Sequence, residues 1–221
     1  MDQNTKKQKV AEAVLDYITS GESLGIGSGS TVNILIENLP KVKNKIRSVV
    51  SSSVKSTELL QAHGFEVSEL RDVGKLTKYI DGADEVNKDL QMIKGGGGAL
   101  TREKILAHAS EKFICIVDDS KKVHTLGNFP LPIEVIPMSR SSVSLELIKH
   151  GGRPVLRENF ISDNSNLILD IHNLQIMEPI KLERDINNIP GVVTNGIFAL
   201  DHAHILLSAS DDGVEVSELN A

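Results

Sequence analysis

The chain contains no tryptophan, few other aromatic residues, a single cysteine and no long hydrophobic run. Cys115 therefore cannot form a disulfide within the chain, and its apolar neighbours in FICIV indicate an inert thiol in a buried strand. No stretch approaches the roughly 20 apolar residues that cross a bilayer. The N-terminal lysines are also not followed by the apolar segment of a signal peptide. These absences predict a cytoplasmic protein without a membrane partner.

Positive charge is in deficit as well. The chain has 24 basic and 30 acidic residues, which gives a formal net charge of -6. Together with the scarcity of aromatic residues, this charge argues against nucleic acid as a partner. An anionic ligand must then be held by a local site. The 221 residues provide for one large core or two modest ones.

The first half of the chain alternates short apolar runs with segments of helical periodicity. This alternation predicts a parallel sheet with helices on both faces, a doubly wound α/β fold. We expect its strands at residues 24–26, 46–50, 65–68, 77–80 and 113–117. We expect its helices at residues 7–18, 32–38 and 101–109, with a further helix that stops at Gly64.

After Phe129 the pattern changes. Strands are expected at residues 131–136, 154–157, 167–172 and 192–199, and helices at 142–149 and 180–187. This order, β-α-β-β-α-β, is typical of a ferredoxin-like α+β domain. We therefore expect a catalytic domain of residues 1–128 plus 202–221, to which two C-terminal strands return, and a small domain of residues 129–201.

Residues 25–31, GIGSGST, lie between an expected strand and an expected helix. Their backbone amides and hydroxyls are suited to hold a phosphate at the positive end of a helix. A plain turn with a serine or threonine helix cap fits the same residues equally well. The spacing is not that of a dinucleotide fingerprint, and the segment lacks the lysine of a P-loop.

Residues 81–104 concentrate charge and glycine in one connection. The residues concerned are Asp81, Asp84, Glu85, Lys94, the four glycines at 95–98, and Glu103. A long connection of this kind inside a folded domain indicates function, and glycines let the backbone approach a ligand closely. The simpler interpretation is a solvated turn followed by a glutamate that suits its helix dipole. In open α/β sheets, ligands bind beyond the carboxyl ends of the strands, where both of these motifs fall.

Two other clusters are weaker candidates for a binding site. Lys121 and Lys122 follow the strand at 113–117 and are either a solvated pair or a source of one phosphate-binding lysine. His202 and His204 have strand spacing, but without a third ligand we interpret them as structural.

Taken together, the motifs GIGSGSTV, VSSSVKSTELL, YIDGADEVN, LQMIKGGGGALTREK, EKFICIVDDSK, FPLPIEVIP and IPGVVTNGIFA resemble the type A ribose-5-phosphate isomerases. The resemblance implies an intramolecular oxidoreductase of the pentose phosphate pathway. Such an enzyme interconverts ribose 5-phosphate and ribulose 5-phosphate through an enediolate, without metal or cofactor. It also implies a homodimer or homotetramer.

The resemblance further implies roles for particular residues. Glu103 is the base that moves the proton, assisted by Asp81, Asp84 and Lys94. An adjacent base and cation are what proton abstraction next to a carbonyl requires. The residues implied in substrate binding are Ser28, Gly29, Ser30, Thr31, Gly82, Ala83, Gly95, Gly96, Gly97 and Lys121, with Lys7 as a weaker candidate for the phosphate.

Three positions depart from the family pattern. Ser28 stands where threonine is common, which puts affinity in doubt, and Asp119 adds a negative charge near Lys121. Gly98 stands where alanine is common, and we expect a looser loop with a modest effect on substrate affinity.

Rival functions are a sugar-phosphate deaminase or lactonase, a non-catalytic sugar-phosphate sensor, and a metal-dependent isomerase using a hydride shift. The set of Asp81, Asp84, Lys94 and Glu103 makes a deaminase or lactonase less suitable. A sensor of this kind would carry a DNA-binding module, and none fits before Leu24. A metal-dependent isomerase would need a His/carboxylate cluster, which the sequence does not indicate.

Overall fold

The computed structural model describes residues 1–219, in two compact units. The larger unit comprises Met1–Ala83, Arg102–Lys121 and the C-terminal segment from Ala203. The smaller unit comprises Asp84–Thr101 and Lys122–His202. This division differs from the predicted domains mainly at Asp84–Thr101, the connection rich in charge and glycine, which groups with the smaller unit.

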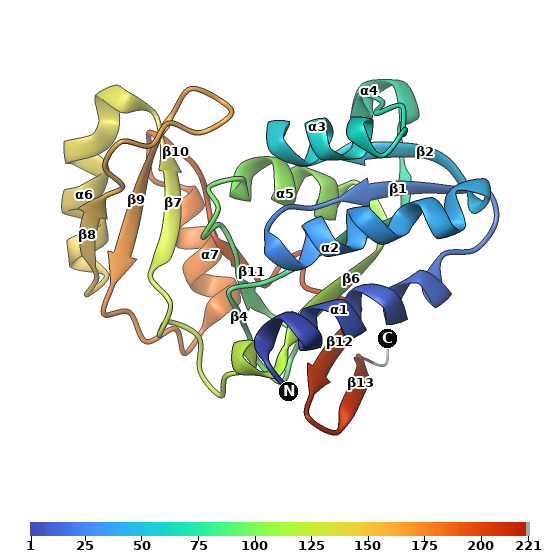
Figure 1. The fold of residues 1–221 in the computed structure, drawn as a ribbon. Helices are drawn as coiled ribbons and strands as arrows, with labels where there is room; N and C mark the ends of the chain where they lie inside the picture. Colours follow the sequence, from blue (N-terminus) through green and yellow to red (C-terminus); the bar gives the residue numbers. More distant parts are fainter. Residues whose placement is uncertain (220–221) are drawn as a thin grey trace. The chain divides into compact units, whose positions relative to one another are not determined.

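A six-stranded sheet forms the centre of the larger unit (Figure 1). In spatial order its strands are β13 (Gly213–Glu218), β12 (Ile205–Ser210), β6 (Ser110–Asp118), β3 (Leu76–Asp81), β1 (Glu22–Ile26) and β2 (Ile46–Ser51). Neighbouring strands are parallel except for the antiparallel hairpin of β12 and β13. The predicted, mainly parallel sheet is therefore confirmed. Because Ile26 of β1 lies opposite Ile80 of β3, both strands end at the same edge of the sheet.

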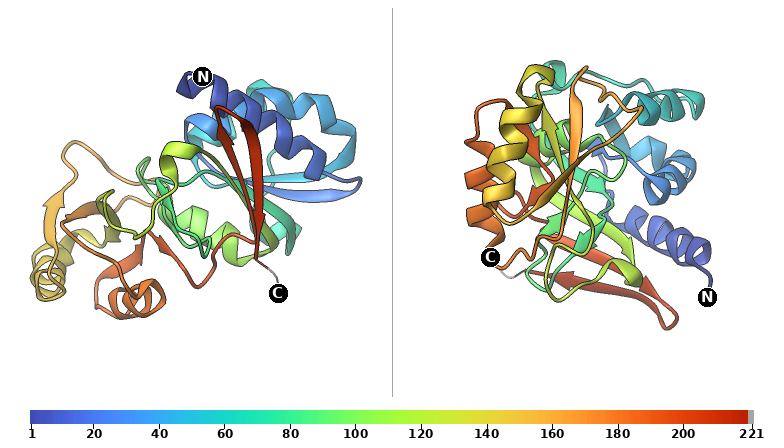
Figure 2. Two further views of the ribbon diagram at one scale, coloured as in Figure 1. Left: turned by 90° about the horizontal axis from the view of Figure 1, so that it is seen from below. Right: turned by 90° about the vertical axis from the view of Figure 1, so that its left-hand side faces the viewer.

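Helices cover both faces of this sheet, as Figure 2 shows. Helices α1 (Gln3–Ala13), α2 (Ser30–Asn38) and α3 (Val54–Ala62) lie on one face and bury a core that includes Ile26 and Ile80. Helix α5 (Leu100–His108) lies on the other. The shorter helical segments of this unit are η1 (Val14–Tyr17), η2 (Leu39–Lys45), α4 (Leu70–Val73) and η3 (Asp119–Lys121).

Two local expectations for this unit need correction. The first helix begins at Gln3, ahead of the expected residue 7, because the Asp2 carboxylate accepts a hydrogen bond from the Thr5 amide at 2.9 Å and caps it. The strand expected at 65–68 is wrong. Val67 makes only an isolated bridge to Val49, although Phe65 is buried in the core. The apolar character of residues 65–68 therefore reflects packing against the core and not pairing in a strand ladder.

The smaller unit has the predicted ferredoxin-like topology. Its antiparallel sheet has the order β10 (Val192–Asn195), β7 (Leu131–Val135), β9 (Leu167–His172) and β8 (Arg153–Leu156). Helices α6 (Arg140–Lys149), preceded by η4 (Pro137–Ser139), and α7 (Pro179–Asn187) connect these strands. Val143 of α6 and Ile186 of α7 both pack into the core of this sheet.

A second, three-stranded sheet in the smaller unit carries the connection after Asp84. It consists of β11 (Ile197–Phe198), β5 (Met92–Ile93) and β4 (Glu85–Val86). The single strand expected at 192–199 therefore divides at Gly196 between two sheets. At Gly196 a side chain is excluded, since a Cβ atom would lie 2.3 Å from the Lys94 carbonyl oxygen. None of the helices within residues 1–219 combines the length and apolar character needed to cross a bilayer.

Candidate active site

Asp81 is the last residue of β3 and is fully buried. Its Oδ1 atom accepts hydrogen bonds from the backbone amides of Gly82 at 2.7 Å and Ser28 at 3.0 Å. Its Oδ2 atom accepts a hydrogen bond from the Tyr79 hydroxyl. Donors on both oxygens fix the plane of this carboxylate at the edge where β1 and β3 end.

Gly27 is the residue that allows the β1–α2 turn to reach Asp81. A Cβ atom at this position would lie 1.9 Å from the Asp81 carboxyl carbon. The next residues turn away into α2 through Gly29, whose φ of +98° is unfavourable for other residues. The glycines of GIGSGST thus have two separate uses, a close approach at Gly27 and a left-handed conformation at Gly29.

Tyr79 is a fully buried side chain two residues before Asp81 on β3. Alternate residues of a strand share a face, so the phenol reaches the carboxylate along that face, and its ring packs on Phe113 with 4.8 Å between ring centroids. Burial raises the pKa of the Tyr79 phenol well above its usual value of 10.0, and the nearby charges of Asp81 and Glu103 raise it further. The phenol therefore remains protonated and acts as a hydrogen-bond donor.

Glu103 lies in the first turn of α5 and is only 3% exposed. Its Oε1 atom accepts a hydrogen bond from the Ser28 hydroxyl at 2.6 Å. Ser28 therefore contacts both Asp81, through its amide, and Glu103, through its side chain. The sequence predicted that these residues lie at one edge of the sheet, and within the larger unit they are joined by hydrogen bonds.

In the larger unit Lys7 reaches the same turn, and Lys121 lies at the end of η3. The Lys7 ammonium donates to the Ser30 hydroxyl at 3.0 Å, which joins α1 to the start of α2. Lys121 is partly buried at the end of η3. The neighbouring Asp119 forms an ion pair with Lys6 at 2.9 Å, so its charge is balanced by α1. The weakening of phosphate binding expected from Asp119 stays a prediction.

In the smaller unit, Asp84 and Lys94 flank the three-stranded sheet. The Asp84 amide donates to the Ile93 carbonyl and the Lys94 amide to the Gly196 carbonyl, both at 2.9 Å. Lys94 is 3% exposed, and its ammonium lies 5.5 Å from the centroid of the Phe198 ring. A cation at this depth on a rigid sheet is suited to stabilise a fixed negative charge.

The glycine run follows Lys94 directly. Gly95 and Gly98 are buried and have φ values of +103° and +85°, whereas Gly96 and Gly97 are exposed. The Gly96 amide donates to Asp84 Oδ2 at 2.8 Å. A Cβ at Gly96 would lie 2.6 Å from Asp84 Oδ1, so the run is glycine-rich partly to admit this carboxylate.

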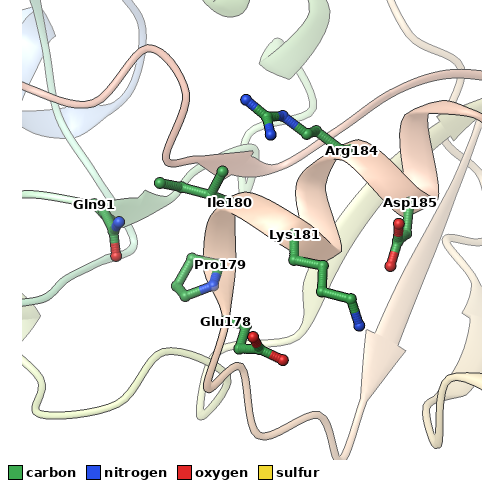
Figure 3. Close-up of a pocket in the computed structure, with 7 residues that line it drawn as sticks. All are labelled: Gln91, Glu178, Pro179, Ile180, Lys181, Arg184 and Asp185. Carbon is green, nitrogen blue, oxygen red and sulfur yellow. The ribbon is translucent and has the colours of Figure 1, made fainter.

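The structure also has a hollow that none of these residues lines. It lies in the smaller unit around the start of α7, and its lining residues are Gln91, Glu178, Pro179, Ile180, Lys181, Arg184 and Asp185 (Figure 3). Its side chains carry charges of both signs. In the part of the chain that the structure describes, no cluster of three or more His, Cys, Asp or Glu side chains is placed to hold a metal ion.

Residues 48–213 match the sequence model of the family described as ribose 5-phosphate isomerase A (phosphoriboisomerase A). The chain belongs to the ribose 5-phosphate isomerase A family. Its relatives in that family include ribose-5-phosphate isomerase A of Haemophilus influenzae, which is 52% identical over 217 residues, 98% of this chain and 99% of the relative.

Solved structures in the ribose 5-phosphate isomerase A family share the whole fold. Ribose 5 phosphate isomerase A of Neisseria gonorrhoeae superposes with a TM-score of 0.97 at 47% identity, covering 100% of this chain and 99% of that chain. A D-ribose-5-phosphate isomerase in complex with phospho-erythronic acid gives a TM-score of 0.94 at 35% identity, covering 99% of this chain and 100% of that chain.

Sequence reasoning missed Gly27 and Tyr79 in this member of the ribose 5-phosphate isomerase A family. Gly27 is within the quoted motif, but its importance depends on the position of Asp81, which only the fold shows. Tyr79 resembles any other apolar strand residue in sequence. The one available signal was its spacing of two from Asp81, which places both on the same face of β3.

Proposed function

We propose that this protein is a ribose-5-phosphate isomerase, which interconverts ribose 5-phosphate and ribulose 5-phosphate in the cytoplasm as part of the pentose phosphate pathway. Membership of the family supports the reaction, and the complex of a relative with phospho-erythronic acid supports a phosphorylated sugar-like ligand. The observation that carries the proposal is Glu103, a nearly buried carboxylate held by Ser28 next to the phenol-bound Asp81.

Glu103 is the base. It removes the proton from C2 of the open-chain aldose, and the electron pair moves to the aldehyde oxygen to give an enediolate. Return of the proton to C1, with transfer of a hydroxyl proton from O2 to O1, completes the ketose. A buried carboxylate whose Oε1 atom accepts a hydrogen bond from the Ser28 hydroxyl is oriented for such a transfer.

The other groups handle charge and oxygen-bound protons. Lys94 stabilises the negative charge on the enediolate, because its ammonium is shielded from water. Asp81 and Asp84 assist ring opening and the movement of protons between oxygens. Residues 28–31, Gly82, Ala83, the glycines at 95–97 and the lysines at 7 and 121 bind the substrate and its phosphate.

The protein is also proposed to be a homodimer or homotetramer. The smaller unit exposes large apolar side chains that a second copy would cover, namely Met138, Leu145, Ile148, Ile161 and Met177. Large exposed apolar groups are typical of protein interfaces. Light scattering after size-exclusion chromatography tests this proposal, and a monomer at micromolar concentration would contradict it.

A direct assay tests the function. Purified protein is given ribose 5-phosphate in D₂O with EDTA, and ribulose 5-phosphate and its deuterium content are measured. We expect turnover that survives EDTA, with solvent deuterium at C1 of the product. Loss of turnover in EDTA, together with a product that fully retains the transferred hydrogen when EDTA is left out, would indicate the metal-dependent hydride shift. Binding without turnover would indicate a sensor.

A further inference from the structure

The glycine run has no side chains with which to hold its own shape. Gly96 and Gly97 are exposed, and glycine is the residue with the most conformational freedom. A binding loop made of such residues would lose much conformational entropy on meeting a ligand. Whatever fixes its backbone beforehand therefore contributes directly to affinity.

Arg157, which follows β8, makes the contacts that fix this backbone. Its Nη1 atom donates to the Gly95 carbonyl at 3.2 Å and to the Gly96 carbonyl at 3.1 Å. The other side of the guanidinium is held by Asp170, with Nε to Oδ2 at 2.9 Å and Nη2 to Oδ1 at 2.5 Å. A forked, two-point pair of this kind leaves the guanidinium little freedom to rotate.

The support behind Arg157 is itself rigid. The Arg157 amide donates to the Ile168 carbonyl at 2.9 Å, which extends the pairing of β8 with β9. The guanidinium carbon lies 5.3 Å from the centroid of the Phe160 ring. The segment after Phe160 is tied to the fully buried Glu134, which accepts hydrogen bonds from Ser162 at 2.8 Å and Asn166 at 2.8 Å.

The two carbonyl contacts determine where the amides of the run point. In a planar trans peptide the C=O and N–H bonds point in opposite directions. With the Gly95 carbonyl directed at Arg157, the Gly96 N–H points away from it, and it does donate to Asp84 Oδ2. By the same geometry, the Gly96 carbonyl directs the N–H of exposed Gly97 away from the guanidinium.

We propose that Arg157 is a positioning residue for substrate binding, because it fixes the Gly95–Gly96 and Gly96–Gly97 peptide units so that the Gly96 amide stays on Asp84 and the Gly97 amide faces a substrate oxygen atom. This inference rests on the proposed function and deepens it. The positive charge of the Arg157 guanidinium, placed against the two carbonyl oxygens, also polarises these peptide units and makes their N–H groups stronger donors. Lysine cannot replace this arrangement, because it lacks the planar fork that reaches Asp170 and both carbonyls together.

The test compares Arg157→Lys with Arg153→Lys, a change of an exposed arginine on β8. KM and kcat are measured with ribose 5-phosphate, and the dissociation constant of phospho-erythronic acid is measured by calorimetry. Loss of the two carbonyl bonds predicts an increase of about tenfold in both KM and that dissociation constant for Arg157→Lys. We expect kcat to change far less, and Arg153→Lys to match the wild type.

A merely structural role would lower the melting temperature and the active fraction and leave KM and analogue affinity unchanged in the folded protein. That result would overturn the proposal. If Arg157→Lys fails to fold, Asp170→Asn serves instead, since it frees the guanidinium and predicts a smaller increase in the same two quantities. Wild-type turnover with unchanged affinity in these variants refutes the inference alone. Absence of wild-type turnover refutes the proposed function and the inference with it.

Discussion

The Phe160 ring occupies the space that a side chain at Gly98 would need, and replacing Gly98 with alanine tests this contact. A Cβ atom at Gly98 would lie 2.1 Å from Cζ of Phe160, and Gly98 has a φ of +85°. The left-handed conformation costs an alanine about 1 kcal/mol, and moving the half-buried ring aside costs about 1 kcal/mol more. We therefore expect Gly98→Ala to lower the free energy of unfolding by about 2 kcal/mol and to raise KM, because Phe160 also packs against Arg157.

Gly151 supplies a matched control in the same unit. It also has a φ of +85°, but a Cβ atom there meets nothing within 4 Å. Urea unfolding of Gly151→Ala therefore measures the backbone strain alone, about 1 kcal/mol. In the double variant Gly98→Ala/Phe160→Ala the overlap disappears, so the two changes should show a coupling of about 1 kcal/mol. Equal losses for Gly98→Ala and Gly151→Ala, without coupling to Phe160, would refute the reasoning. An unchanged or lower KM in Gly98→Ala would favour the looser loop that the sequence predicted.

Two further changes probe the larger unit. Tyr79→Phe removes one donor from the Asp81 carboxylate, so we expect kcat to fall about tenfold with ribose 5-phosphate, since hydrogen bonds to charged groups are strong. Tyr17→Phe, at the only other tyrosine, should have no effect, and equal activity of both variants would argue against a role for the phenol. Glu22→Gln tests pH dependence: burial opposes the ionised form, but hydrogen bonds from Lys78, Thr19 and Thr77 outweigh it and lower the pKa of Glu22 below 4.5. The depressed pKa means that its stabilisation is present above about pH 4.5 and is lost as the pH falls through the lowered value. The difference in urea midpoint between wild type and variant should therefore shrink in acid, and a constant difference would contradict this.

The sequence predicted the parallel sheet and the ferredoxin-like topology correctly, because both follow from local periodicity. It failed where tertiary contacts decide the outcome. Phe65 and Val67 have strand-like character, yet Phe65 is buried and Val67 partly buried against the core without forming a strand ladder. The strand expected at 192–199 divides at Gly196, where β10 pairs with β7 and β11 with β5, and the nearby Lys94 carbonyl leaves no room for a side chain at that point.

For the candidate site, sequence reasoning found the residues that act by their own chemistry, such as Asp81 and Glu103. Within the larger unit the structure places these two around Ser28. Reasoning from sequence could not find residues that act through others. Arg157 lies more than fifty residues from the glycine run in sequence, and nothing in its local motif indicates the carbonyls that it contacts.

Exchange of the C1 hydrogen of ribulose 5-phosphate with D₂O, followed by NMR, tests the central claim that Glu103 is the base. The measurement compares wild type, Glu103→Gln and the surface control Glu111→Gln, whose carboxylate is exposed beside Lys75. We predict that exchange in Glu103→Gln falls at least about a hundredfold, the lower range for loss of a general base. Phospho-erythronic acid should still bind that variant, and Glu111→Gln should match the wild type. Undiminished exchange in Glu103→Gln would show that another group moves the proton.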